Sequence, residues 1–378
     1  MENDNSRRDF ISKVAVGTIA VATPAFAKNN AKTKEERNMN KKVILAHRPL
    51  GFQWEPQNPF LFCVHHEDFL PAGNSEMAPD PSLLLGRQIG SDFVVKDGFR
   101  MYHGDKIPGF PAHPHRGFET VTVVRQGMVD HADSKGASGR YGGGDVQWMT
   151  AGSGLQHSEM FPLLNSENEN TLELFQIWLN LPKKSKMVTP DYKMLWSEDI
   201  PNADFTDDSG NKTNVTILAG ELAGKKPPSP PRNSWASDPE NDVTIWIIKM
   251  EANAKWKVPP ASKDLSRSLY FFKGTSVKAA GENVESYHAV DVVSDEEILL
   301  ENGNNESFIL MLQGKPIDEP VVKYGPFVMN TKEEIQQAFI DYQKDNFGGW
   351  PWKDSGQVHS REKGRFAIHF DGSEEIKS

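Results

Sequence analysis

The chain has 378 residues, with 52 acidic against 42 basic side chains and a formal net charge of −10 at pH 7. This length leaves room for two domains of ordinary size. Sequence-independent binding to nucleic acid needs a basic face, so the acidic balance argues against that function class, while binding to another protein stays open.

The first 27 residues resemble an export signal. Arg7 and Arg8 lie in the run SRRDFISK, which is similar to a twin-arginine motif and precedes an apolar run at 14–21 that is too short to span a membrane. Residues 25–27, AFA, have the pattern of a cleavage site. The alternative is a short amphipathic helix with a chance arginine pair. We expect a signal peptide at 1–27, export to the periplasm by the twin-arginine route, and no stable membrane span after its removal.

The residues that follow the signal are polar. Residues 28–42 are charged and lack apolar periodicity, so we expect a disordered spacer. Cys63, the only cysteine of the chain, lies in the apolar run 60–64 and has no partner for an internal disulfide. We expect it to be a small buried hydrophobic side chain.

From residue 43 to about residue 182, short apolar stretches alternate with Gly, Pro and Asp. Strands of about five residues at this spacing are typical of a β-sandwich or barrel, and nothing indicates a parallel sheet with alternating helices. Residues 120–124, TVTVV, are all β-branched, which favours a half-buried strand. The expected strands are 43–46, 60–64, 93–95, 120–124, 146–149 and 172–179.

The metal-ligand pattern of the sequence consists of two short pairs. Side chains alternate faces along a strand, so His113 and His115 project to one side, and so do His157 and Glu159. Two such strands facing each other would place three imidazoles and one carboxylate around a point. That donor set suits a first-row divalent ion with open positions, whereas structural zinc more often has thiolate ligands. One His-x-His pair can arise by chance, but the second pair strengthens the prediction.

The segments HPHRGFETVT and GDVQWMTAGSGLQHSEM contain both pairs and are similar to the pirin family, the two-domain members of the cupin superfamily. The resemblance extends from about residue 43 to residue 352 and includes GKPIDEPVVKYGPFVMNTKEEI. It implies an all-β fold with two tandem cupin-like β-barrel or jelly-roll domains. It also implies that His113, His115, His157 and Glu159 hold a mononuclear iron. Iron(II) is therefore the expected metal, and manganese, nickel, copper and zinc stay open.

Glu119 competes with Glu159 for the carboxylate position. The general cupin pattern takes its carboxylate from the glutamate four residues after the second histidine, and Glu119 has the strand parity of His113 and His115. The resemblance favours Glu159 as the ligand, leaving Glu119 as a hydrogen-bond acceptor that orients an imidazole or a neighbouring strand. Either carboxylate could be a general base for a substrate hydroxyl.

A second β-rich series follows a connection at 183–200. Two series of similar length imply a duplicated domain, so we expect one domain at 43–182 and another at 183–330. The second lacks the histidine pattern, and His288 is isolated, so we expect a structural or regulatory domain without a metal site. The proline-rich residues 225–232 should form a surface loop. The expected strands are 215–218, 243–250, 268–272, 286–293, 298–301 and 308–312.

A helix and a tail complete the chain at 331–378. Thr331 and Glu334 form a capping-box signature at the start of the run TKEEIQQAFIDYQKD. One apolar face recurs at helical spacing: Ile335, Ala338, Phe339 and Tyr342. We expect this helix to pack on a barrel. The tail contains a short apolar run at 366–370 to which the sequence assigns no role.

The surroundings of the histidines suggest a substrate class. Some of the flanking side chains could line a cavity for a flat organic molecule, although most should be core. They are Phe110, Phe118, Trp148, Met149, Met160 and Phe161. Pirins are similar to quercetin 2,3-dioxygenases, so the resemblance implies an oxidoreductase that acts on a small planar aromatic substrate, such as a flavonol, with dioxygen. The alternative is a metal-dependent interaction or redox-sensing module without turnover, whose protein partner the sequence does not name.

Overall fold

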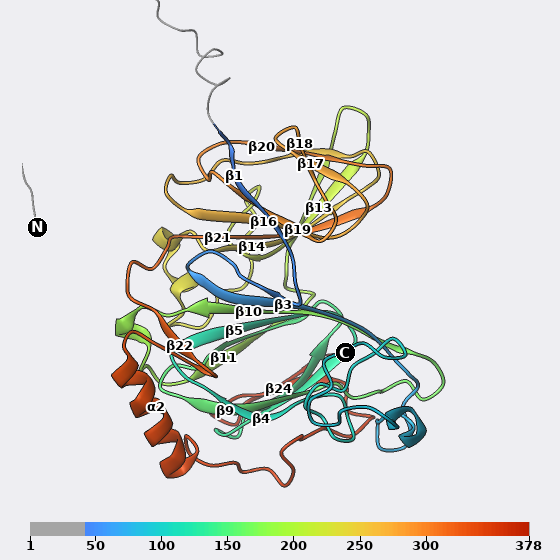
Figure 1. Cartoon of the computed structure of the whole chain (residues 1–378), viewed down its shortest axis with the longest axis vertical. Helices are drawn as coiled ribbons and strands as arrows, with labels where there is room; N and C mark the ends of the chain where they lie inside the picture. Colours follow the sequence, from blue (N-terminus) through green and yellow to red (C-terminus); the bar gives the residue numbers. More distant parts are fainter. Residues whose placement is uncertain (1–41, 378) are drawn as a thin grey trace, which may run out of the picture. The chain divides into compact units, whose positions relative to one another are not determined.

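Antiparallel sheets dominate residues 42–377, the part of the chain that the computed structural model describes. Two β-sandwiches stack on each other, with the first in the lower part of Figure 1. One sheet of the first sandwich has the order β11 (Asp191–Leu195), β8 (Val146–Thr150), β5 (Phe118–Gln126), β10 (Asn170–Asn180), β3 (Phe60–Leu70) and β2 (Gln53–Trp54). Its other sheet has the order β25 (Glu374–Lys377), β24 (Arg365–Ile368), β7 (Ser138–Gly142), β6 (Met128–Asp133), β9 (Leu155–Met160) and β4 (Gly109–His115).

The second sandwich repeats this arrangement. Its larger sheet has the order β1 (Ile44–Pro49), β19 (His288–Val292), β16 (Ser266–Lys273), β21 (Ser307–Gly314), β14 (Thr244–Met250), β13 (Lys212–Ala219) and β12 (Asn202–Thr206). The smaller sheet has the order β15 (Lys255–Val258), β20 (Ile298–Asn302), β17 (Val277–Ala279) and β18 (Glu282–Val284). The predicted all-β fold with two cupin-like domains is therefore confirmed.

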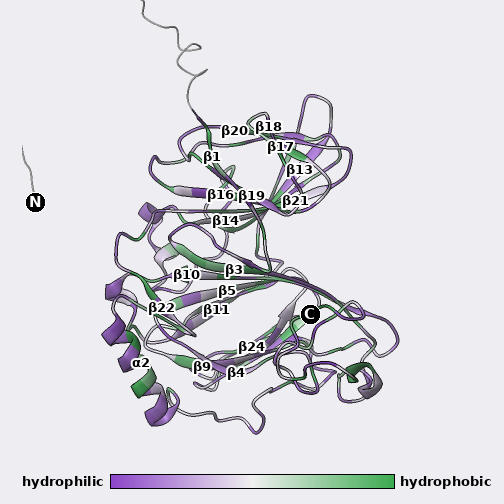
Figure 2. Ribbon diagram, in the orientation of Figure 1, coloured by the Kyte–Doolittle hydropathy of each residue, from purple (hydrophilic) through white to green (hydrophobic). Residues whose placement is uncertain are grey.

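Each sandwich has an apolar core, and a third cluster joins them. Side chains from β5 and β10 of the first domain pack against β14, β16 and β21 of the second. Within this cluster the rings of Trp54 and Tyr270 stack at 5.2 Å, 8° from parallel. Cys63 belongs to it and is fully buried, as predicted, and burial raises the pKa of its thiol. Figure 2 shows hydrophobic residues along β3, which carries Cys63.

The predicted strand at 93–95 is wrong. Val94 and Val95 are 76% and 54% exposed, and an isolated bridge at Asp92 is the nearest pairing before them. Asp97 and Gly98 then take positive φ angles of 52° and 85°, which reverse the chain. The apolar side chains of this stretch therefore lie in the long connection between β3 and β4 rather than in a sheet.

Each end of the described chain pairs with the sandwich that is more distant from it in sequence. β1 precedes the first sandwich in sequence but pairs with β19 of the second, whereas the tail strand β24 pairs with β7 of the first. Arg140 holds the tail in place: its guanidinium donates to both oxygens of Asp130, at 2.6 and 2.7 Å, and to the carbonyls of His359, Ser360 and Lys363. The tail thus completes the sheet that contains β4 and β9.

The predicted helix is α2 (Lys332–Asp345), and its capping box is present. The Thr331 hydroxyl accepts from the Glu334 amide, and the Glu334 carboxylate accepts from the Thr331 amide. Ile335 and Ala338 are buried against the hairpin β22 (Val322–Tyr324) and β23 (Phe327–Met329), while most of the helix is hydrophilic (Figure 2). Short 3₁₀ turns lie at Pro81–Leu84, Lys183–Ser185, Trp235–Ser237 and Pro239–Asn241.

The predicted signal peptide, 1–27, lies outside the described residues, as does the predicted spacer except for Lys42. Within residues 42–377 no helix combines the length and the apolar character that crossing a membrane requires. β1 and β24 each pair with a strand on the other side of a predicted domain boundary. The pairing therefore does not fix the boundaries, which stay predictions.

Candidate metal centre

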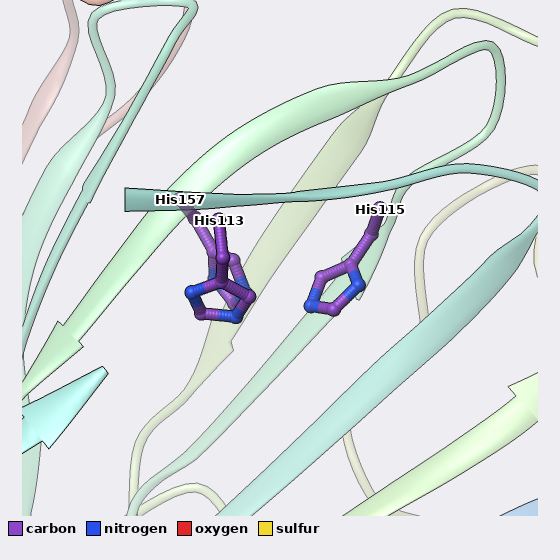
Figure 3. Close-up of side chains that lie close together, drawn as sticks. All are labelled: His113, His115 and His157. Atoms are coloured by element: carbon purple, nitrogen blue, oxygen red, sulfur yellow. The ribbon is translucent and has the colours of Figure 1, made fainter. Parts of the chain in front are cut away.

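Two neighbouring strands carry the histidines of the predicted metal site. β4 and β9 are antiparallel neighbours in one sheet, and His113 lies directly opposite His157. Cross-strand partners share a face of the sheet, so both imidazoles project to the same side as His115 (Figure 3). The ring centroids of His113 and His157 are 4.5 Å apart, and His115 lies 4.8 and 4.9 Å from them. The three imidazoles are brought together by the pairing of β4 and β9 within one sheet, and not by two strands that face each other across the sandwich.

The chemistry of these imidazoles fits a metal ion. One nitrogen from each lies within 4.8 Å of the others. Burial lowers the pKa of all three, to about 4 for His113 and well below the ordinary value for His115 and His157, so each is neutral at pH 7 and offers a lone pair. Nδ1 of His113 donates to the Pro111 carbonyl at 2.9 Å, which leaves Nε2 unprotonated. Both nitrogens of His157 are buried without a hydrogen-bond partner among the described residues.

Glu159 lies at the edge of this cluster. Its Oε2 is 3.8 Å from Nε2 of His157. The Thr122 hydroxyl donates to Oε1 at 3.0 Å and the Gln176 amide donates to Oε2 at 2.7 Å. Burial raises the pKa of the Glu159 carboxyl. The structure therefore brings this carboxylate beside the imidazoles and orients it, and its role as a ligand stays a prediction.

Glu119 faces away from the cluster, toward the second domain. Its carboxylate accepts hydrogen bonds from the Thr150 hydroxyl at 2.7 Å, the Trp148 indole at 3.3 Å and the Ser234 hydroxyl at 2.8 Å. Burial raises its pKa to about 7. These contacts support the role of a hydrogen-bond acceptor that orients a neighbouring strand, here β8. They do not support metal binding by Glu119 or a role as a base beside the metal.

A bend between β4 and β5 explains this orientation. Gly117 has a φ of 85°, and a Cβ there would lie 2.1 Å from the Val328 carbonyl oxygen. Side chains alternate between the two faces only within a continuous strand. The turn at Gly117 interrupts that alternation, so Glu119 no longer shares the face of His113 and His115. Buried Lys186 fixes the bend, because its ammonium group donates to the carbonyls of Gly117 and Val328 at 2.8 and 3.1 Å. Next to the bend, Arg116 pairs with α2 through Asp341 at 2.6 Å.

A pocket of about 440 Å³ opens beside His113 and His115. Its volume is in the range of small-molecule sites, and its walls are largely aromatic. The aromatic side chains are Phe52, Phe62, Phe93, Phe110 and Trp178. Of the flanking residues considered from the sequence, Phe110 lines this pocket, whereas the other five are buried in the apolar clusters or beside them.

Two further histidines line the pocket, and the sequence patterns did not predict them. His66 lies on β3 and His103 in the connection between β3 and β4, and both line the pocket. The adjacent pair His65 and His66 was the available signal, because neighbouring strand residues face opposite sides and one of them must face the interior of the first sandwich. No spacing rule links that pair to the metal pattern.

Two packed β-sandwiches, with a three-histidine cluster in the first, define a two-domain cupin of the metal-binding type. Residues 81–179 match the Pirin family, and residues 245–348 match the Pirin C-terminal cupin domain. The chain belongs to the pirin family.

Individual relatives agree with this assignment. The chain is 38% identical over 268 residues to a protein of Pseudomonas aeruginosa that is named as a candidate quercetin 2,3-dioxygenase, covering 71% of this chain and 86% of that protein. It is 36% identical to mouse pirin, covering 69% of this chain and 85% of pirin. The crystal structure of a quercetin 2,3-dioxygenase from Acinetobacter baumannii superposes with a TM-score of 0.63 at 26% identity, covering 81% of this chain and 98% of that one.

Proposed function

We propose that this chain is a metal-dependent dioxygenase of the quercetin 2,3-dioxygenase type, acting on a small planar aromatic substrate such as a flavonol. The observation that carries the proposal is a three-histidine cluster that opens into an aromatic-walled pocket. The names of the Pseudomonas and Acinetobacter relatives support the same reaction class. Iron(II) is the metal that we propose, and manganese, nickel, copper and zinc are alternatives that the same donors accept.

The side chains around the cluster have distinct tasks in this proposal. The three histidines and Glu159 hold the ion, which when bound supplies Lewis acidity and access to dioxygen chemistry. Glu159 accepts the proton of a substrate hydroxyl in this proposal, because it is the carboxylate that lies beside the imidazoles. Gln176 and Thr122 hold its two oxygens in place. The aromatic walls orient a flat ring system and exclude water.

Oxygen uptake tests the proposed activity. Iron-loaded protein is expected to consume dioxygen and quercetin at matched rates, and removal of the metal by a chelator should stop both. His115→Ala should lower the rate by more than about a hundredfold, because even the loss of groups that only support ligands costs about 10- to 100-fold. The measurement combines an oxygen electrode with the absorbance of the flavonol.

The same experiment distinguishes the two function classes. Equal rates for wild type and His115→Ala would mean that the flavonol is oxidised by free metal or in bulk solution. The metal-dependent interaction or redox-sensing module would then be the better account. Wild type and variant should be compared at equal metal content in solution, so that free iron contributes equally to both.

We also propose that the protein is exported by the twin-arginine route. Cells that express the full chain should accumulate, outside the cytoplasm, a mature form that begins near Lys28. Changing Arg7 and Arg8 together to lysine should retain the protein in the cytoplasm, because the paired arginines are the feature that identifies the signal. Fractionation with N-terminal sequencing measures both, and unchanged export of the double variant would point to another route.

A further inference from the structure

The wall of the pocket contains, outside the three-histidine cluster, a buried histidine that the proposed chemistry does not use. His66 is 4% exposed, and its Nδ1 has no hydrogen-bond partner among the described residues. Its neighbour His65 is also buried, but its Nε2 lies 3.2 Å from a Glu173 oxygen and its Nδ1 lies 3.4 Å from the Tyr287 hydroxyl. Buried polar atoms are nearly always paired, and this Nδ1 is closed off from the pocket, so the nitrogen of His66 that a ligand in the pocket can reach is Nε2.

The position of His66 relative to the cluster follows from Phe110. The Phe110 ring is 6.2 Å from the ring of His113 and 6.0 Å from the ring of His66. His66 does not belong to the group of histidines whose nitrogens lie within 4.8 Å of one another. His66 therefore lines the same pocket as His113 but lies outside the three-histidine cluster, and the Phe110 ring is close to both.

Aromatic rings pack against His66 in the pocket wall. The Tyr102 ring packs edge-on against it at 4.8 Å, and the Phe52 ring packs at 5.7 Å. Tyr102 donates to Asp68, which also accepts two hydrogen bonds of 2.9 Å from Arg100. The imidazole is thus held in one orientation by packed neighbours, as a recognition group must be.

The electrostatic state of His66 suits a neutral polar partner. Burial, followed by the nearby charge of Arg100, lowers its pKa well below the ordinary value. A neutral imidazole offers one donor and one acceptor, which a phenolic hydroxyl can satisfy. The aromatic walls would not compensate the desolvation of a charged group.

A long connection completes the pocket wall. Loops between strands usually have about four to six residues, and much longer ones tend to be functional. Here the connection between β3 and β4 spans 71–108 and supplies Phe93 and His103 to the pocket wall. Nδ1 of His103 donates to the Gly90 carbonyl at 2.7 Å, so its Nε2 is an acceptor. His103 is thus added to the pocket wall by a segment outside the sheets, whereas His66 belongs to β3.

We propose that His66 is a specificity-determining residue that hydrogen-bonds a hydroxyl group on a part of a planar aromatic substrate that lies outside the three-histidine cluster. The inference rests on the proposed function, because the cluster must hold the other end of the same molecule. It assigns the substrate class more narrowly, as polyphenols with a hydroxyl on the terminal ring.

Binding under nitrogen tests this without turnover. Quercetin carries two hydroxyls on its terminal ring and galangin carries none, and the two flavonols are otherwise identical. Calorimetric titration of the metal-loaded protein should give about tenfold tighter binding of quercetin, the size of one buried hydrogen bond. His66→Phe should remove this preference while changing the galangin Kd by less than about twofold. His66→Gln, which keeps a donor and an acceptor, should retain part of it.

The outcomes separate this inference from the proposed function. An unchanged quercetin preference in His66→Phe, or equal weakening of both ligands, would overturn the role of His66 and leave the dioxygenase proposal intact. Equal affinity of the wild type for both flavonols would likewise overturn the role of His66 and leave the dioxygenase proposal intact. Wild-type protein that binds neither flavonol would overturn both proposals. Thermal unfolding of each variant verifies the fold, and His66→Gln carries the comparison if His66→Phe is unstable.

Discussion

His157→Ala is expected to abolish stoichiometric metal binding. Wild-type protein should hold about one equivalent, whereas the variant should lose more than about a hundredfold in affinity, because a ligand contributes more than the groups that support it. The β-fold should persist, since each sandwich has its own apolar core. Elemental analysis after desalting gives the metal content, and circular dichroism confirms the fold. His113→Ala should behave in the same way, and a full equivalent of metal in both variants would contradict the assignment.

The two glutamates provide a matched control for that experiment. Glu159→Gln should weaken metal binding more than Glu119→Gln, because Glu159 lies beside His157 while Glu119 accepts from Ser234 of the second domain. Both substitutions remove one buried carboxylate of the same size. Competition with a chelator ranks the two affinities. The reverse order would return the ligand role to Glu119.

Arg140→Met is expected to destabilise the first sandwich by about 3–5 kcal/mol, the usual cost of removing one partner from a buried ion pair. Asp130 would stay buried without its counter-charge, and the carbonyls of the tail would lose their donor. The free energy of unfolding from urea titration measures the loss. Proteolysis of the tail should accelerate, because Arg140 joins the tail to β6 and β7.

Lys257→Met is the control for this prediction. Lys257 pairs with Glu297 at 2.8 Å, but both side chains are at least half exposed. Exposed pairs contribute about 0–1 kcal/mol. Similar destabilisation by the two substitutions would show that the tail is not held by the buried pair.

Local patterns predicted the elements that local chemistry determines. The β-branched run at 120–124 lies inside β5, and Thr331 with Glu334 caps α2 as expected. The run at 93–95 has the same apolar character, yet turns on both sides keep it out of a sheet. Periodicity cannot distinguish these cases, because pairing depends on a partner strand that is distant in sequence.

The site was only partly predictable, because some of its contacts follow local patterns and others depend on residues distant in sequence. His113 and His157 could be placed together because each has its own short-range pair and the resemblance links the pairs. The orientation of Glu119 could not, since the φ angle of Gly117 is set by the close approach of Val328, more than two hundred residues away. His66 reaches the pocket through the stacking of β3 beneath a long connection, and no motif encodes that contact.

Anomalous diffraction from crystals of the protein purified from its native compartment tests the central claim most directly. Data collected above and below the iron absorption edge should show one peak within bonding distance of a nitrogen from each of His113, His115 and His157. The same peak should lie near an oxygen of Glu159. A metal peak elsewhere in the chain, or metal-replete protein with no peak between these three imidazoles, would contradict the account.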